Sequence, residues 1–231
     1  MVATQEDLVS LSSIFSKIIK RGFGKGPETC YAVLRANRLY VYIGNFMTPS
    51  EEILTNKQEY NLVTKYRSTV ITTLSEELLR EASDILENSF ETLYQDWNYH
   101  SNSGILLLVN NSFNPDVKIE DSFERKLFQL VRQVGSKFHK IPGELKVVKY
   151  TQNICAIESK GVMNPLDYLL VEKGKSELIF TNAREIKKGY YQHRELFEEM
   201  FNRTIEDLFM MWDPNRNRSY LIFIFNKGYT N

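Results

Sequence analysis

The sequence predicts an α+β protein made of two tandem repeats, each with the order α-β-β-α-α-β-β and each forming an antiparallel four-stranded sheet with helices on one face. Apolar residues recur at helical spacing in residues 5 to 21 and 59 to 88, whereas RLYVYIGN, residues 38 to 45, alternates with the period of a strand. The same order of signals then appears a second time, which indicates an internal repeat. We expect the repeats to span residues 1–114 and 115–231 and to be related by a pseudo-two-fold axis.

The first repeat begins with an amphipathic helix over residues 5 to 21. Its apolar residues fall on one helical face: Leu8, Leu11, Phe15 and Ile18. CYAVLRA and RLYVYIGN follow as two strands, and Asn37 between them supplies the turn. These segments therefore predict a helix followed by a β-hairpin.

The rest of the first repeat contains a short helix, a long helix and a second hairpin. The short helix starts at Pro49, and the long helix covers residues 59 to 88. FETLYQDWN and GILLLVN then flank the turn YHSNS. Two hairpins and one helical layer complete the predicted unit.

The second repeat is recognised by matching positions at a nearly constant offset. Pro27 matches Pro142, and Trp97 matches Trp212 at the same offset, while the match to Pro49 lies one residue further on, at Pro165. EDLFMMW and YLIFIF flank DPNRN as its closing hairpin. A polar linker is expected at residues 111 to 121. The alignment drifts after Lys57, which predicts a shorter or kinked long helix in the second repeat.

Composition excludes several classes of function. Acidic and basic residues balance at 29 each, so no net field attracts nucleic acid. The apolar runs GILLLV and YLIFIF are far shorter than the roughly 20 residues that span a bilayer, so we expect no membrane insertion. The N-terminal segment MVATQEDLVSLSS lacks the features of a signal peptide, which predicts a cytoplasmic protein. Cys30 and Cys155 are expected to be buried thiols.

The segment GKGP, residues 24 to 27, has two interpretations. It fits no phosphate-loop motif, and it follows a helix instead of preceding one, so the helix dipole would favour cations there. The first interpretation is a helix stop, in which Gly22 or Gly24 takes the left-handed position and Pro27 prevents continuation. The alternative is an anion site formed by Gly24, Lys25 and Gly26. The second repeat has KIPG here and keeps Pro142, so this alternative is expected in the first repeat only.

The segment MTPSEEIL predicts a helix cap. Thr48 is the N-cap, Pro49 the first helical residue and Glu51 the third, so hydroxyl and carboxylate can satisfy two backbone amides reciprocally. The second repeat has NPLD at the corresponding position, with Pro165 and Asp167 in place of Pro49 and Glu51. A structural role is therefore the leading interpretation of Glu51 and Asp167.

The sequence offers no catalytic, metal or cofactor site. The histidines at positions 100, 139 and 193 have no zinc-site spacing with each other or with the two cysteines. No Gly-x-Ser-x-Gly elbow is present. We therefore expect no metal, no cofactor and no catalytic residue. The aromatic segment YQDWNYHS, residues 94 to 101, keeps a ligand groove open as an alternative.

Several of these motifs together resemble the MpsC domain, a bacterial domain of unknown function. The matching residues are GKGPE at 24 to 28, TPSE at 48 to 51, Leu54 and Arg67. The first copy resembles the domain over about residues 5 to 111, and the second is a divergent copy. The family is associated with a Na⁺-translocating, membrane-potential-generating system whose membrane subunits resemble inorganic-carbon uptake proteins. The resemblance implies an accessory role and no established catalytic residues.

Two functional hypotheses follow, with an enzyme as a third. The first is a non-enzymatic accessory or regulatory protein of a membrane ion or bicarbonate system, whose partners are membrane transporter subunits. The second is a sensor that binds an anion or nucleotide through Gly24, Lys25, Gly26 and Arg67, or in the cleft between the repeats. In both hypotheses the chain is a monomer with an internal pseudo-dimer.

Overall fold

The computed structural model describes residues 3–35, 37–112 and 119–226 of the chain. It divides into two compact units, unit 1 from Met1 to Pro115 and unit 2 from Asp116 to Asn231. The central part of the predicted linker, residues 113–118, lies outside the described residues. Each unit contains one four-stranded antiparallel sheet, which confirms the predicted fold class and the two-repeat layout.

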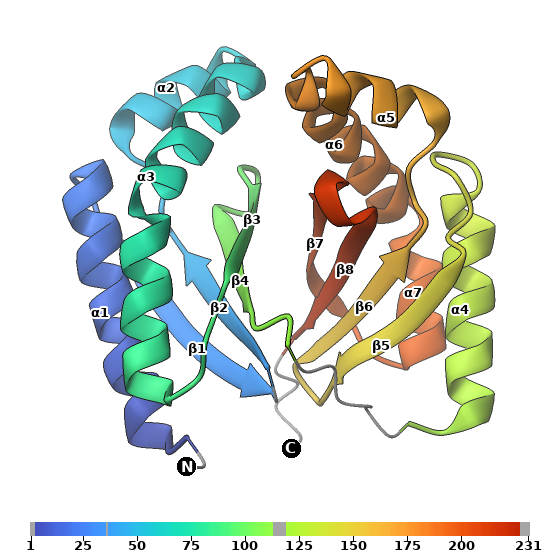
Figure 1. Cartoon of the computed structure of the whole chain (residues 1–231), viewed down its shortest axis with the longest axis horizontal. Coiled ribbons are helices and arrows are strands. Elements are labelled where there is room, and N and C mark those ends of the chain that lie inside the picture. Colours follow the sequence, from blue (N-terminus) through green and yellow to red (C-terminus); the bar gives the residue numbers. More distant parts are fainter. Residues whose placement is uncertain (1–2, 36, 113–118, 227–231) are drawn as a thin grey trace. The chain divides into compact units, whose positions relative to one another are not determined.

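Unit 1 has the predicted order of elements. They are α1 (Gln5–Phe23), β1 (Thr29–Arg35), β2 (Arg38–Gly44), α2 (Pro49–Asn56), α3 (Tyr60–Leu86), β3 (Thr92–Asn98) and β4 (Ser103–Val109). The strand order is β1-β2-β4-β3, with Cys30 opposite Ile43 and Trp97 opposite Gly104. Figure 1 shows α1 and α3 side by side over one face of this sheet.

The core of unit 1 lies between these two helices and the sheet. Leu11 and Phe15 of α1 are fully buried, as is Ile71 of α3. They pack in one cluster with the alternating sheet residues Leu39, Val41, Ile43, Leu106 and Leu108. The apolar residues that alternate along the strands and those on one face of α1 thus form a single buried layer.

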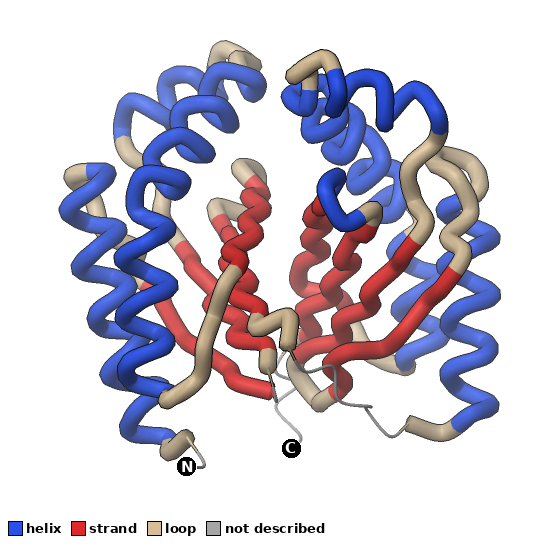
Figure 2. The backbone as a smooth tube through the Cα atoms, viewed as in Figure 1, coloured by secondary structure: helices blue, strands red, loops and turns tan. Residues whose placement is uncertain are grey.

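Unit 2 repeats this layout with one additional break. Its elements are α4 (Asp121–Gly135), β5 (Glu144–Tyr150), β6 (Ile154–Lys160), α5 (Pro165–Glu172), α6 (Ser176–Gln192), α7 (Arg194–Phe201), β7 (Ile205–Asp213), the 3₁₀ turn η1 (Pro214–Arg216) and β8 (Arg218–Phe225). The strand order β5-β6-β8-β7 is the counterpart of that in unit 1. Figure 2 shows the helices of each unit covering one side of that unit's sheet.

The long helix of unit 1 corresponds to α6 and α7, which are separated at His193. The kink expected from the drifting alignment is therefore confirmed. Buried positions nevertheless occur in the same order in both units: Val63 and Ile179, Arg67 and Ala183, Ile71 and Ile186. Arg67 consequently corresponds to Ala183.

Candidate functional site at the start of α2

The first turn of α2 is fixed by a reciprocal capping box. Thr48 Oγ1 accepts a hydrogen bond from Glu51 N at 3.3 Å, and Glu51 Oε2 accepts one from Thr48 N at 2.9 Å. Pro49 occupies the first helical position, where a backbone N–H has no acceptor within the helix, so its absence costs no hydrogen bond. These local contacts explain why the sequence starts a helix here.

Glu51 also forms an ion pair with Arg67 of α3. Arg67 Nε donates to Glu51 Oε1 at 2.7 Å, and Arg67 Nη2 donates to Glu51 Oε2 at 2.6 Å. Both residues are fully buried, with an exposed fraction of 0%. A two-point pair of this kind compensates both charges in a low-dielectric interior, where either charge alone would be strongly unfavourable.

Three aromatic rings surround the Arg67 guanidinium. Its Cζ lies 4.1 Å from the ring centroid of Phe23, 4.0 Å from that of Phe46 and 4.6 Å from that of Trp97. Arg67 Nη1 is buried and has no hydrogen-bond partner within the described residues. The ring faces carry partial negative charge, so they provide the remaining stabilisation of the cation. We call Glu51, Arg67 and these three rings the arginine box.

Lys25 contacts the same segment at the residue that precedes Thr48. Its Nζ donates to the carbonyl oxygen of Met47 at 2.7 Å. The chain arrives there because Gly24 ends α1 in the left-handed conformation, with φ of 77°. Gly26 follows, and a Cβ at that position would lie 3.2 Å from Lys20 Cβ. Pro27 then leads into β1.

The turn between β3 and β4 also holds this segment. Asn102 Oδ1 accepts hydrogen bonds from Phe46 N at 2.9 Å and from Met47 N at 3.0 Å. Asn102 has φ of 50°, a left-handed conformation that asparagine tolerates better than most residues. The loop before α2 is thus bound by a lysine, an asparagine and the buried arginine.

Unit 2 keeps most of this arrangement but has no arginine box. Lys140 Nζ donates to the Met163 carbonyl at 3.2 Å, and Asn217 Oδ1 accepts from Met163 N at 2.9 Å. Asn164 and Asp167 form the expected capping box around Pro165. Among the described residues Asp167 has no ion-pair partner, because the position of Arg67 is taken by Ala183.

The structure brings Lys25 and Arg67 to one short segment, Met47 to Glu51, where both contact groups of the protein itself. Sequence reasoning missed the aromatic part of the box and the asparagine clamps. It also missed Lys140, although a signal was present: Lys25 stands two residues before Pro27, as Lys140 does before Pro142.

Titratable groups elsewhere show the effect of burial. Burial raises the pKa of Tyr99, whose ring contacts Phe46, to about 12. Burial also raises the pKa of the Cys30 thiol to about 11 and lowers the pKa of His139 below its usual range. In the part of the chain that the structure describes, no three His, Cys, Asp or Glu side chains are grouped to hold a metal ion.

A model of a known protein family matches the chain in both units. The family model described as "Na+-translocating membrane potential-generating system (MpsC)" matches residues 6–112 and again residues 119–227. No curated protein and no solved structure matches the chain. No helix within the described ranges has both the length and the apolar character needed to cross a membrane.

Proposed function

Because the chain belongs to the MpsC family, we propose that it is a cytoplasmic, non-enzymatic accessory or regulatory protein of a membrane system that translocates Na⁺ or bicarbonate. Its partners in this proposal are membrane transporter subunits. It acts as a monomer in which two fused units replace two subunits, and it binds no nucleic acid.

One observation carries the proposal: the charged side chains of the family motif bind groups of the protein itself. Glu51 and Arg67 neutralise each other in the core, and Lys25 is bound to a backbone carbonyl. A reaction site needs charged groups that reach a substrate. Side chains engaged in this way instead hold α2 in a fixed position, which suits a surface that a partner recognises.

The elements held by these contacts carry exposed apolar side chains. In unit 1, Ile53 of α2 has an exposed fraction of 58% and Leu62 of α3 one of 52%. In unit 2, Leu166 of α5 has an exposed fraction of 61% and Leu169 one of 47%. Leu166 and Leu169 lie three residues apart on α5 and therefore share one helical face, and apolar side chains exposed together are typical of interaction sites.

The test is affinity purification of the tagged protein from its native cells in mild detergent, with mass spectrometry of the proteins that co-purify. We expect membrane transport subunits in near-stoichiometric yield. A Leu166→Ser/Leu169→Ser variant should lose them, whereas Lys17→Ser on an exposed position of α1 should retain them. Recovery of the protein without any membrane subunit would contradict the proposal.

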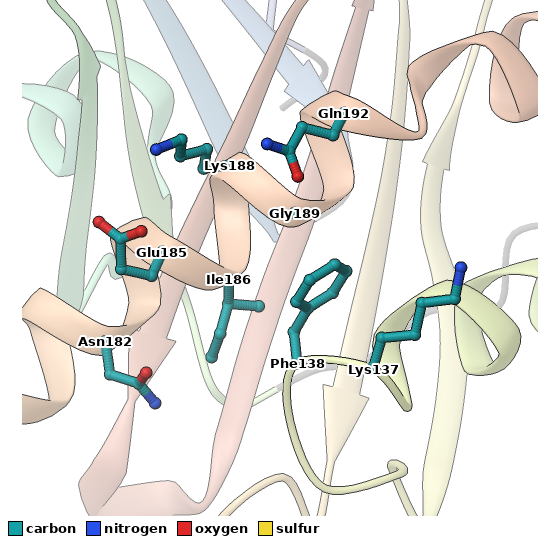
Figure 3. Close-up of a pocket in the computed structure, with 8 residues that line it drawn as sticks. All are labelled: Lys137, Phe138, Asn182, Glu185, Ile186, Lys188, Gly189 and Gln192. Atoms are coloured by element: carbon teal, nitrogen blue, oxygen red, sulfur yellow. The ribbon is translucent and has the colours of Figure 1, made fainter.

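A small-molecule sensor is the second candidate function. One version of this function places an anion at Lys25, where the ligand would compete with the Met47 carbonyl. That form is tested by Lys25→Ala, which should abolish a ligand-induced rise in melting temperature. The observation that favours a sensor is a separate cavity in unit 2, lined by two lysines (Figure 3).

A further inference from the structure

Unit 2 has a groove between α4 and α7, two helices that lie side by side in Figure 1. Its volume is about 630 Å³. The apolar side chains that line it come from both helices: Phe123 and Leu130 of α4, and Leu196 and Met200 of α7. Phe123 and Leu130 are two helical turns apart, which corresponds to about 10 Å along α4. The groove is therefore long enough for about two turns of another helix, and we call it the α4–α7 groove.

The floor of the groove is held by packing inside unit 2. The ring centroid of Phe123 lies 5.1 Å from that of Tyr150 and 6.1 Å from that of Phe201. Leu130 and Met200 are partly buried against the same core. Side chains ordered in this way lose little conformational freedom when a partner binds to them.

Leu196 makes the groove more apolar than the corresponding surface of unit 1. The helices α3 and α7 both end at a residue in the left-handed conformation, Glu87 and Asn202 respectively. The residue six positions before this end is Glu81 in unit 1 and Leu196 in unit 2. Leu196 has an exposed fraction of 41%. Unit 2 thus exposes a leucine at a position where unit 1 has a carboxylate.

Phe123 differs from unit 1 in the same way. The helices α1 and α4 align through their first buried residues, Leu11 and Leu127. The residue four positions earlier is Asp7 in unit 1 and Phe123 in unit 2. Two carboxylates of unit 1 are therefore replaced by apolar side chains in unit 2. Apolar side chains gathered in this way at a surface are typical of an interaction site.

The charged residues at the groove are mainly acidic. Glu120 and Glu199 line it, together with one cation, Lys126. Glu195 is exposed and lies one turn before Glu199 on the same face of α7. Within the described residues, Lys126 and Glu199 form no hydrogen bond or ion pair, so both are available to a partner. Because carboxylates outnumber the ammonium, a positively charged partner is favoured.

We propose that the α4–α7 groove binds a basic amphipathic helix in a cytoplasmic segment of a membrane transporter subunit. This inference rests on the proposed function, which supplies the class of partner. Cytoplasmic segments of membrane proteins are enriched in lysine and arginine. An amphipathic helix binds a groove through apolar residues at helical spacing. The apolar face of the partner helix covers Leu196 and Met200, and its basic residues pair with Glu195 and Glu199.

The test uses the full chain and a fluorescein-labelled synthetic peptide of about 18 residues. Its leucines lie on one helical face and its lysines on the other. One control peptide has the same residues in an order that destroys the apolar face, and a second has glutamate in place of lysine. Fluorescence polarisation should show that the amphipathic lysine peptide binds at least about tenfold more tightly than either control. Absence of binding, or equal affinity for the glutamate peptide, would overturn the proposal.

Two variants locate the peptide. Leu196→Glu introduces the residue of unit 1 at an exposed position, and Glu199→Lys reverses one of the acidic charges; each should weaken peptide binding at least about fivefold. The matched control is Leu166→Ser/Leu169→Ser on α5, which should leave the peptide affinity unchanged because these residues do not line the groove. Peptide affinity that survives Leu196→Glu would overturn the proposal.

Other occupants of the groove are tested with the same variant. Sedimentation of the chain alone would reveal a second copy, and binding to phosphatidylglycerol vesicles would reveal a lipid surface. We expect neither, and a dimer or vesicle binding that is lost in Leu196→Glu would overturn the proposal.

Co-purification separates this inference from the proposed function. If wild type and Leu196→Glu recover membrane subunits equally, the inference fails and the proposed function stands. If neither recovers any membrane subunit, the proposed function fails, whatever the peptide affinity.

Discussion

Glu51 and Arg67 join two helices through a carboxylate that also caps one of them. Oε2 of Glu51 accepts from Thr48 N, from Thr48 Oγ1 and from Arg67 Nη2, while Oε1 accepts from Arg67 Nε. The start of α2 and the middle of α3 are therefore coupled, because displacement of either helix breaks the ion pair and removes one of the three donors to Glu51 Oε2.

Replacing Arg67 with methionine should lower the free energy of unfolding of unit 1 by about 3–5 kcal/mol. The substitution leaves the Glu51 carboxylate buried without a counter-charge. Urea unfolding followed by tryptophan fluorescence measures the effect. The double variant Arg67→Met/Glu51→Gln removes the stranded charge and keeps a side chain able to cap α2, so it should recover at least about 1 kcal/mol. If Arg67→Met alone lowered the free energy of unfolding by less than about 1 kcal/mol, the ion pair between Glu51 and Arg67 would not be buried in solution.

Lys25→Met should weaken the anchoring of α2 by about 1 kcal/mol, because the half-buried ammonium loses its bond to the Met47 carbonyl. Native-state hydrogen exchange of the α2 amides measures the loss. Lys140→Met should have a smaller effect on α5, since its bond is longer, at 3.2 Å, and Lys140 is exposed. Lys17→Met is the matched control; an equal effect of all three substitutions would show that the carbonyl contacts contribute nothing.

The sequence was sufficient for the architecture because its signals are local. The alternation in RLYVYIGN and the helical period of α1 each lie within one element, and the cap of Thr48 by Glu51 spans three residues. The arginine box has no such signal. Phe23, Phe46 and Trp97 belong to segments that meet only after the sheet and helices pack, so apolar residue type predicted burial but not the cation among them.

Asn102→Ala should lower the free energy of unfolding more than Asn102→Gly does. Both variants lose the two hydrogen bonds from Phe46 N and Met47 N, but only alanine must adopt φ of 50° with a side chain that disfavours it. The difference between the two, about 1 kcal/mol, isolates the backbone term. Urea unfolding measures this difference. A glycine variant as unstable as the alanine variant would show that the left-handed backbone at position 102 carries no extra cost for alanine.

Acidification should destabilise unit 2 through His139. Its pKa is lowered by burial, against the opposing effect of the bond to the Lys140 carbonyl. The unfolded chain therefore binds this proton first, so stability is full above the unfolded pKa of about 6.5 and falls as the pH decreases toward the folded pKa. Urea unfolding of the wild type and of His139→Gln at several pH values in this window measures the slope of the free energy of unfolding against pH. We expect a smaller slope in the variant.

Gly104→Ala should destabilise unit 1 by at least about 2 kcal/mol, although alanine normally fits a strand as well as glycine does. An added Cβ would lie 2.1 Å from Trp97 Cε3, so the indole must move. It cannot move freely, because the same ring lies 4.7 Å from Phe46 and 4.6 Å from the Arg67 Cζ.

The matched control is Gly143→Ala in unit 2, where a Cβ would lie 3.8 Å from its nearest neighbour, the Lys160 carbonyl oxygen, in ordinary contact. The strand position in unit 2 that follows Trp212 as Gly104 follows Trp97 is Ser219, which already has a Cβ. The requirement for glycine is therefore specific to the arginine box. Equal stability of Gly104→Ala and Gly143→Ala in urea unfolding would mean that Trp97 does not pack over β4 in solution.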